Sequence, residues 1–137
     1  MNRKEFLSSL GLTAVGILCA ECLEACHGPT DAIVSAGVDF TLDLTAAANA
    51  GLAVAGGYIY RDGVIVAQTI AGSYIAVSKA CTHAGTTVQF IAKSSQFYCP
   101  NHGSTFMLDG SVVNGPAAVA LTRYSTRLTG TNLRVYS

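Results

Sequence analysis

Short stretches in which apolar and polar residues alternate run through most of the chain. Over 38–44 the apolar side chains fall on every second residue, which is the period of a strand that buries one face. Two apolar runs, 57–60 and 64–67, flank the dipeptide Asp62-Gly63, an arrangement that signals a β-hairpin with a two-residue turn. The pattern therefore predicts strands joined by tight turns.

Further strands are expected at intervals that are typical of an all-β domain. They cover 74–78, 88–91, 96–99, 111–113, 121–125 and 132–135, with a polar turn at 93–95. The segment 46–55 is rich in Ala and Gly and fits neither period. About 100 residues suffice for one small core, so the sequence predicts a single all-β domain of small antiparallel sheets over 37–137.

The first 26 residues differ in composition from the rest. Arg3 and Lys4 precede a largely apolar run over 6–20, which is shorter than the ~20 residues that span a bilayer. These proportions are typical of a signal peptide. The segment 23–26 also resembles a lipobox, in which the cysteine, here Cys26, carries a lipid. We therefore expect 1–26 to be a signal peptide or lipoprotein leader.

The leader sets the expected location of the protein. The segment 3–7 resembles a weakened twin-arginine export signal, and 27–36 has the composition of a short linker. The expected location is the cell envelope, on the periplasmic side of the membrane or secreted, with membrane association through the leader or a lipid on Cys26. Two alternatives stay open: an uncleaved N-terminal helix that anchors the domain, and a cytosolic protein with an apolar N-terminus.

Candidate chemistry is concentrated in two short segments. Cys81 and His83 form C-x-H, Cys99 and His102 form C-x-x-H, and 15 residues separate His83 from Cys99. Two thiolates and two neutral imidazoles can hold a [2Fe-2S] cluster with the cysteines on one iron and the histidines on the other. The same four residue types can hold one zinc ion, although zinc motifs usually open with C-x-x-C.

The segments CTHAG and CPNHGS resemble the two cluster-binding loops of the Rieske [2Fe-2S] family. The stretch 103–117 that follows resembles the hairpin and Gly-Pro loop of the same family. The resemblance implies a cluster-binding tip formed by two loops and one [2Fe-2S] cluster. It also implies a set of site residues: the ligands Cys81, His83, Cys99 and His102, and Ser104 as a hydrogen-bond donor to a bridging sulfide.

Three positions depart from the quinol-oxidising branch of that family. Its loop disulfide would join the positions that Thr86 and Asn101 occupy here, so the chain is a disulfide-lacking variant. A family tyrosine that donates to a ligand sulfur is replaced by Phe106. Hydrogen bonds to cluster sulfurs raise the reduction potential, so we expect a potential below that of the quinol oxidisers.

Composition narrows the function. Eight basic residues balance eight acidic ones and no basic run occurs, so we expect no nucleic-acid partner. Three of the five cysteines lie in the leader, which leaves none in the mature domain for a disulfide. The only histidine besides the two candidate ligands is His27, so no second iron site is expected and the chain alone should not transform a substrate.

The resemblance implies an electron-transfer protein that carries one Rieske-type cluster. We expect a cell-envelope redox subunit or carrier for a respiratory or periplasmic oxidoreductase, such as the electron-transfer subunit of a quinol-cytochrome reductase. Its partner would be a redox protein or a membrane complex, with quinol as a candidate donor. The alternatives are the ferredoxin component of a Rieske oxygenase system and a structural zinc-binding domain.

Overall fold

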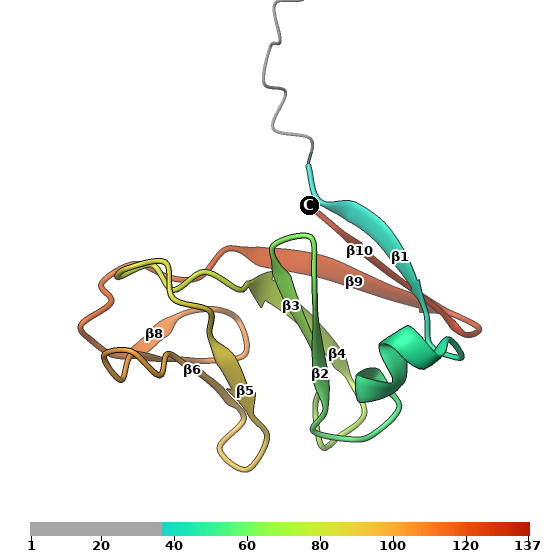
Figure 1. Cartoon of the computed structure of the whole chain (residues 1–137), viewed down its shortest axis with the longest axis horizontal. Helices are drawn as coiled ribbons and strands as arrows, with labels where there is room; N and C mark the ends of the chain where they lie inside the picture. The colour runs from blue at the N-terminus through green and yellow to red at the C-terminus, as the bar shows by residue number, and fades with distance from the viewer. Residues whose placement is uncertain (1–36) are drawn as a thin grey trace, which may run out of the picture. The chain divides into compact units, whose positions relative to one another are not determined.

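A computed structural model describes residues 37–137 (Figure 1), so the expected leader over 1–26 and linker over 27–36 lie outside the described residues. The described part contains strands and one short 3-10 helix: β1 (Asp39–Asp43), η1 (Ala47–Leu52), β2 (Tyr58–Arg61), β3 (Val64–Gln68), β4 (Tyr74–Ser78), β5 (Gln89–Ile91), β6 (Gln96–Tyr98), β7 (Thr105–Phe106), β8 (Val112–Asn114), β9 (Arg123–Thr129) and β10 (Asn132–Tyr136). The all-β prediction is confirmed. Among these residues, no helix has the length and apolar character needed to cross a bilayer.

The strands form two antiparallel sheets (Figure 1). The larger sheet has the order β1-β10-β9-β4-β3-β2, and the smaller has the order β5-β6-β7-β8. The smaller sheet is inserted in the chain between β4 and β9, which pair directly with each other at Ala76–Tyr124 and Val77–Arg123. The Ser78 N–H donates to the Thr122 carbonyl over 2.8 Å. The chain therefore leaves the larger sheet at the end of β4 and returns to it at the start of β9, and these two ends lie side by side.

The predicted hairpin over 57–67 is present as β2 and β3. Arg61 pairs with Val64, and the two residues between them, Asp62 and Gly63, have φ angles of 46° and 81°. Both angles lie in the left-handed region, which the favoured two-residue turns require and which Gly and Asp tolerate best. The dipeptide Asp62-Gly63 therefore favours the hairpin because both residues tolerate the left-handed backbone conformation of the turn.

The ambiguous segment 46–55 forms the 3-10 helix η1. Its Leu52 is buried, and the Asn49 side-chain amide donates to the Asp43 carbonyl over 2.8 Å. Strand β9 also differs from the expected 121–125, because it starts later and runs on to Thr129. The extension is polar except for Leu128 and mostly exposed, and its pairing with β10 keeps it extended. Periodicity could not show this, since no buried face marks the added residues.

The core consists of two clusters on opposite faces of β3, all of whose apolar residues are buried. Val64 and Val66 point into a cluster with β1, β10 and η1, whereas Ile65 and Ala67 point into a cluster with the smaller sheet. The second cluster also contains Cys81, Val88, Phe90, Phe97, Cys99, Phe106, Ala117 and Leu121. The two candidate cysteines are therefore part of the core that joins the sheets.

Candidate metal centre

The first candidate loop follows β4 and is closed by its own backbone. The Gly85 N–H donates to the Cys81 carbonyl over 2.7 Å, and the Cys81 N–H donates to the Thr86 carbonyl over 2.8 Å. Gly85 has a φ of 75°, which a residue with a side chain adopts only at a cost. The loop therefore turns back on itself within six residues and holds the Cys81 side chain inward, with 3% of the residue exposed.

The second candidate loop, which follows β6, repeats this hydrogen-bond pattern. The Gly103 N–H donates to the Cys99 carbonyl over 3.0 Å, and the Cys99 N–H donates to the Ser104 carbonyl over 2.8 Å. Gly103 has a φ of 80°. Cysteine, glycine four residues later and a hydroxyl residue five residues later thus occupy equivalent places in the two loops. Thr86 is the counterpart of Ser104.

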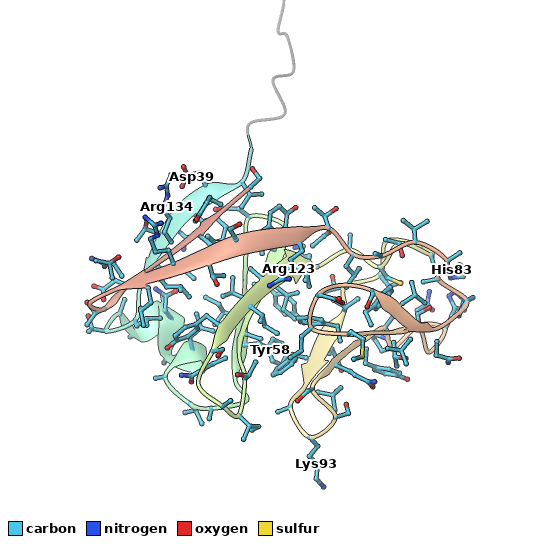
Figure 2. The ribbon with its side chains drawn as sticks, turned by 180° about the vertical axis from the view of Figure 1, so that it is seen from behind. Asp39, Tyr58, His83, Lys93, Arg123 and Arg134 are labelled. Atoms are coloured by element: carbon cyan, nitrogen blue, oxygen red, sulfur yellow. The ribbon has the colours of Figure 1, made fainter. Side chains whose placement is uncertain are left out.

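The loops face each other and bring like side chains together. The Nδ1 atoms of His83 and His102 are 3.1 Å apart, and their exposed rings meet edge-on with centroids 4.7 Å apart. Cys81 and Cys99 are buried, free of disulfides and part of the same core cluster. Figure 2 shows His83 at the outer end of the domain, away from Lys93 on the β5–β6 turn. The tip therefore has a buried thiol pair and an exposed imidazole pair.

The surroundings of the Cys99 sulfur favour its charged form. Burial raises the pKa of this thiol, but hydrogen bonds from the Asn101 N–H, the Cys81 thiol, the His102 N–H and the Thr86 hydroxyl together lower the pKa below its ordinary value. Thiolate is the form that binds metal. The lowered pKa makes the thiolate of Cys99 easier to form.

Ser104, the expected hydrogen-bond donor to a bridging sulfide, is fully buried at the end of the second loop. Its Oγ accepts a hydrogen bond from the Ala117 N–H over 2.9 Å, which leaves the hydroxyl proton of Ser104 for another acceptor. On the opposite side, the Thr82 hydroxyl donates to the Val119 carbonyl over 2.5 Å. The Gly-Pro loop over 115–120 is therefore attached to both candidate loops.

The donor set fits a group that contains two metal atoms with different ligands. Nitrogen ligands about 2.0–2.1 Å from a tetrahedral metal lie about 3.3 Å apart, close to the observed separation of the His83 and His102 Nδ1 atoms. The cysteines and the histidines form two pairs, as a [2Fe-2S] cluster with two kinds of iron ligand requires.

The three loops at the tip share an unusual composition. The segments 81–87, 99–104 and 115–120 contain no Asp, Glu, Lys or Arg. Val119, 64% exposed, adds an apolar side chain to this end of the domain. The tip therefore presents two imidazoles within a surface that carries no acidic or permanently basic side chain.

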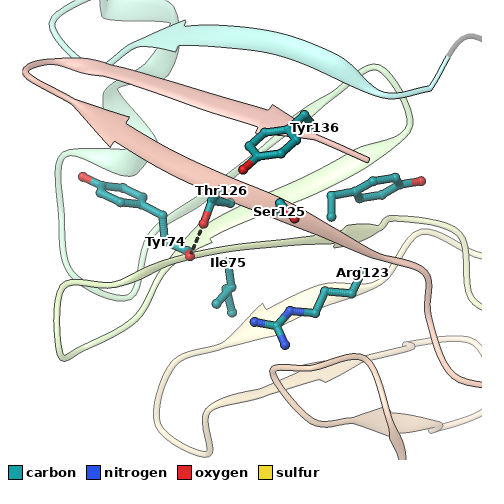
Figure 3. Close-up of a pocket in the computed structure, with 7 residues that line it drawn as sticks. Tyr74, Ile75, Arg123, Ser125, Thr126 and Tyr136 are labelled. Carbon is teal, nitrogen blue, oxygen red and sulfur yellow. Dashed lines mark hydrogen bonds between the residues drawn. The ribbon is translucent and has the colours of Figure 1, made fainter.

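A separate pocket of about 500 Å³ opens where β4 and β9 diverge (Figure 3). Beyond their two paired positions, the strands are linked by the Thr126 hydroxyl, which donates to the Tyr74 carbonyl over 3.0 Å. The lining comprises Tyr74, Ile75, Arg123, Tyr124, Ser125, Thr126 and Tyr136. It includes neither cysteine nor histidine, so the pocket is distinct from the candidate metal centre.

The fold and the site together define an all-β iron–sulfur protein with a Cys-Cys and a His-His pair on two facing loops. The family model for the Rieske [2Fe-2S] domain matches residues 43–125, which is more than half of the chain. The chain belongs to the Rieske [2Fe-2S] family, and its cofactor is one [2Fe-2S] cluster.

Curated relatives are iron–sulfur subunits of cytochrome b6-f complexes. The subunit from Chlorobaculum thiosulfatiphilum is 36% identical over 73 residues, which is 53% of this chain and 40% of the relative. The subunit from Microcystis aeruginosa is 36% identical over 61 residues, which is 44% of this chain and 34% of the relative. The matched region thus spans well under half the length of these relatives.

Two solved structures extend the comparison. The plasma membrane Rieske protein PetC3 from Synechocystis PCC 6803 is 36% identical, with a TM-score of 0.49 over 54% of this chain and 76% of its own. The ferredoxin of carbazole 1,9a-dioxygenase from Nocardioides aromaticivorans IC177 is 27% identical, with a TM-score of 0.52 over 60% of this chain and 86% of its own. The ferredoxin, at a TM-score of 0.52, shares the fold of this chain.

Proposed function

We propose that this protein is a one-electron carrier or redox subunit of the cell envelope, in which Cys81, His83, Cys99 and His102 hold the [2Fe-2S] cluster. The observation that carries the proposal is the separation of the four side chains into a buried thiol pair and an exposed imidazole pair at one tip. The bound cluster supplies reversible one-electron chemistry in this family. Ser104 completes the proposed site as a hydrogen-bond donor to a bridging sulfide.

The cysteine pair and the histidine pair have different roles at this tip. The buried cysteines keep water from the sulfur side of the centre, since 3% of Cys81 and 2% of Cys99 are exposed. The exposed histidines bring the other side of the centre to the surface, where a partner can approach. Two neutral imidazoles in place of two thiolates also make the site less negative, which favours uptake of an electron.

The location and partner belong to the same proposal. The domain over 37–137 follows a linker over 27–36 and a leader over 1–26, which attaches the protein to the membrane directly or through a lipid on Cys26. The partner is a membrane redox complex, with quinol as the electron source. The support is the similarity to iron–sulfur subunits of cytochrome b6-f complexes and the composition of the leader.

The ligand assignment is tested by metal analysis and electron paramagnetic resonance. We expect two irons and two acid-labile sulfides per chain in the wild type, and a changed or absent signal of the reduced cluster in His83→Cys and Cys99→Ser. The matched control is His27→Cys, which replaces the only other histidine. One zinc per chain without sulfide would contradict the proposal, and so would a normal signal in Cys99→Ser.

A second function is favoured by one observation. The chain matches 86% of the carbazole dioxygenase ferredoxin at 27% identity, so the domain fits a small carrier that serves an oxygenase. Cell fractionation of the full chain separates the two functions. If the wild type is recovered with the membranes and the Cys26→Ser variant is not, the result supports a lipid-anchored carrier. If the wild type and the variant are both recovered in the cytosol, the result supports the ferredoxin.

A further inference from the structure

The smaller sheet covers one face of the larger sheet over β3 and β4 but leaves the same face of β9 exposed. Val77 of β4 lies in the core cluster that joins the sheets, and its register partner on β9 is the exposed Arg123. Directly opposite residues share a face, and so do residues two apart along a strand. Arg123, Ser125 and Arg127 therefore continue this face on β9, and all three are exposed.

The pocket of about 500 Å³ between β4 and β9 opens on this face (Figure 3). Ile75, Arg123, Ser125 and Tyr136 line it from this face, since Ser125 and Tyr136 are directly opposite each other in the β9–β10 pair. The lining contains one guanidinium, several hydroxyls and no acidic side chain. Its volume lies in the range of small-ligand sites, and its polar groups suit an anion.

The arginines around the pocket are only partly compensated. Arg134 of β10 forms a bidentate pair with Asp39. Within 37–137, neither Arg123 nor Arg127 forms an ion pair, although Arg127 lies directly opposite Arg134. Like charges in opposite positions destabilise a sheet, so a bound anion would stabilise this one. Asp109, the acidic residue on which the charge of Arg123 acts, accepts two hydrogen bonds within its own turn instead.

We propose that this pocket binds a phosphate group, and that the phosphate belongs to the headgroup of an anionic phospholipid. The proposal rests on the proposed attachment of the protein to a membrane. The planar guanidinium of Arg123 matches two oxygens of one phosphate. The hydroxyls of Ser125 and Tyr136 can bond the alcohol that is esterified to it, for which the pocket has room.

The position of the pocket favours a lipid as the source of the phosphate. The chain enters the domain beside the pocket, because Asp39 of β1 pairs with the lining residue Tyr136. Residues 26 and 37 are eleven positions apart, so the chain between a lipid on Cys26 and the domain spans at most about 40 Å. This end of the larger sheet is therefore kept within reach of the membrane surface, where anionic lipids attract arginine side chains.

The site lies apart from the cluster-binding tip. Figure 2 shows Arg123 near the middle of the domain and His83 at its outer end. None of the lining residues belongs to the tip loops 81–87, 99–104 and 115–120. A headgroup in the pocket would thus hold the domain at the membrane and leave the imidazole pair accessible to a redox partner.

The experiment titrates the full-length holoprotein in maltoside micelles, which contain no phosphate, and follows the backbone amide signals of residues 123–126 by nuclear magnetic resonance. The probes are phosphatidylglycerol, phosphatidylcholine, inorganic phosphate and acetate. We expect phosphatidylglycerol to shift these signals and to bind about tenfold more tightly than each of the other three probes, because it alone combines a net negative phosphate with a hydroxylated alcohol.

Three variants locate the binding. Arg123→Gln removes the guanidinium, and Ser125→Ala removes one hydroxyl. The matched control is Arg61→Gln, because Arg61 is exposed at the end of β2 and does not line the pocket. We expect the dissociation constant for phosphatidylglycerol to rise about tenfold in Arg123→Gln and about threefold in Ser125→Ala, and to change less than about twofold in Arg61→Gln.

Unshifted signals in the wild type, or an unchanged dissociation constant in Arg123→Gln, overturn the proposal, and Ser125→Ala decides if Arg123→Gln does not fold. Equal binding of inorganic phosphate overturns the lipid source. Equal binding of phosphatidylcholine overturns the anionic headgroup, and equal binding of acetate overturns the phosphate. Recovery of the wild type in the cytosol would instead contradict the proposed function, and the titration would still report on the pocket.

Discussion

Phe106 lacks the hydroxyl of the family tyrosine, and we expect this difference to affect the reduction potential of the centre. It is fully buried, belongs to the core cluster that contains both loop cysteines, and occupies the place of the family tyrosine. We expect Phe106→Tyr to add one sulfur hydrogen bond, as the resemblance to the family implies, and to stabilise the reduced state by about 1–2 kcal/mol for a charge-assisted bond. Since 59 mV corresponds to a tenfold change for one electron, the potential should rise by tens of millivolts.

Voltammetry of wild type and variant measures this shift. Phe40→Tyr is the matched control, because Phe40 packs against the other core cluster. The hydrogen-bond account fails if the potential is unchanged or lower in a variant whose new hydroxyl lies within reach of the Cys99 sulfur.

The sequence could identify the ligand candidates but not every residue that acts on them. Cys81, His83, Cys99 and His102 stand in a spacing that few other sites share, so they could be proposed from the chain alone. Thr86 could be recognised only as the absence of a cysteine. Its hydroxyl helps to lower the pKa of Cys99, and this effect depends on how the two loops face each other, which no local pattern contains.

Among the elements, β1 and β10 are joined by an ion pair at the edge of the larger sheet. The Arg134 Nε and Nη2 atoms donate to the two carboxylate oxygens of Asp39 over 2.8 and 2.5 Å, and the guanidinium lies over the Tyr136 ring. The hydrogen bond from Arg134 lowers the pKa of Asp39 below its ordinary value of 3.8.

A lowered pKa in the folded state fixes the sign of the pH dependence. The pair stabilises the fold when the pH is above 3.8, and the contribution disappears as the pH falls through the lower folded-state value. Urea unfolding should therefore place Asp39→Asn below wild type at pH 7 and close to it well below pH 3.8. A difference that persists unchanged into that acidic range would contradict the assignment.

Gly110 connects the β7–β8 hairpin to the end of the Gly-Pro loop. Its carbonyl accepts a hydrogen bond from the Leu121 N–H over 2.8 Å, its φ is 89°, and an added Cβ would clash with the Leu121 carbonyl oxygen. Gly110→Ala should destabilise the domain by roughly 1–3 kcal/mol, because it adds a clash to a disfavoured backbone conformation.

Gly130→Ala is the matched control for this substitution. Gly130 has a φ of 59° but nothing within 4 Å of its hypothetical Cβ, so only the backbone cost of about 1–2 kcal/mol remains. Thermal unfolding of both variants gives the comparison. An equal loss of stability in the two variants would show that the contact with Leu121 does not matter.

Elements with a clear local signal could be predicted, and those fixed by distant contacts could not. The turn at Asp62-Gly63 follows from the backbone freedom of two residues. Strand β7 has only two residues, and its pairing with β6 and β8 rather than its own pattern makes it a strand. The helix η1 likewise depends on Leu52 reaching the core between the strands of the larger sheet.

At the scale of the whole molecule, the described domain contains a complete core. Both clusters and all proposed site residues lie within 37–137. We expect a protein lacking 1–36 to fold, to melt within a few degrees of the full chain and to contain two irons and two sulfides. Circular dichroism and metal analysis test this expectation, and an unfolded or cluster-free product would show that the first 36 residues contribute to the domain.

The absence of acidic and basic side chains affects how a redox partner associates with the tip. It is a property of three loops, 81–87, 99–104 and 115–120. Long-range Coulomb steering speeds encounters and makes them sensitive to ionic strength, but it needs fixed charge near the docking surface. The rate constant for electron exchange with a charged small redox partner should therefore change by less than about twofold between 10 and 150 mM salt, a range over which a steered encounter slows strongly. Stopped-flow measurements would show this, and a steep decrease would reveal steering from elsewhere on the domain. The proposed attachment to a membrane would provide the alternative to steering, because confinement raises the effective concentration of the two proteins and short-range fit completes the recognition.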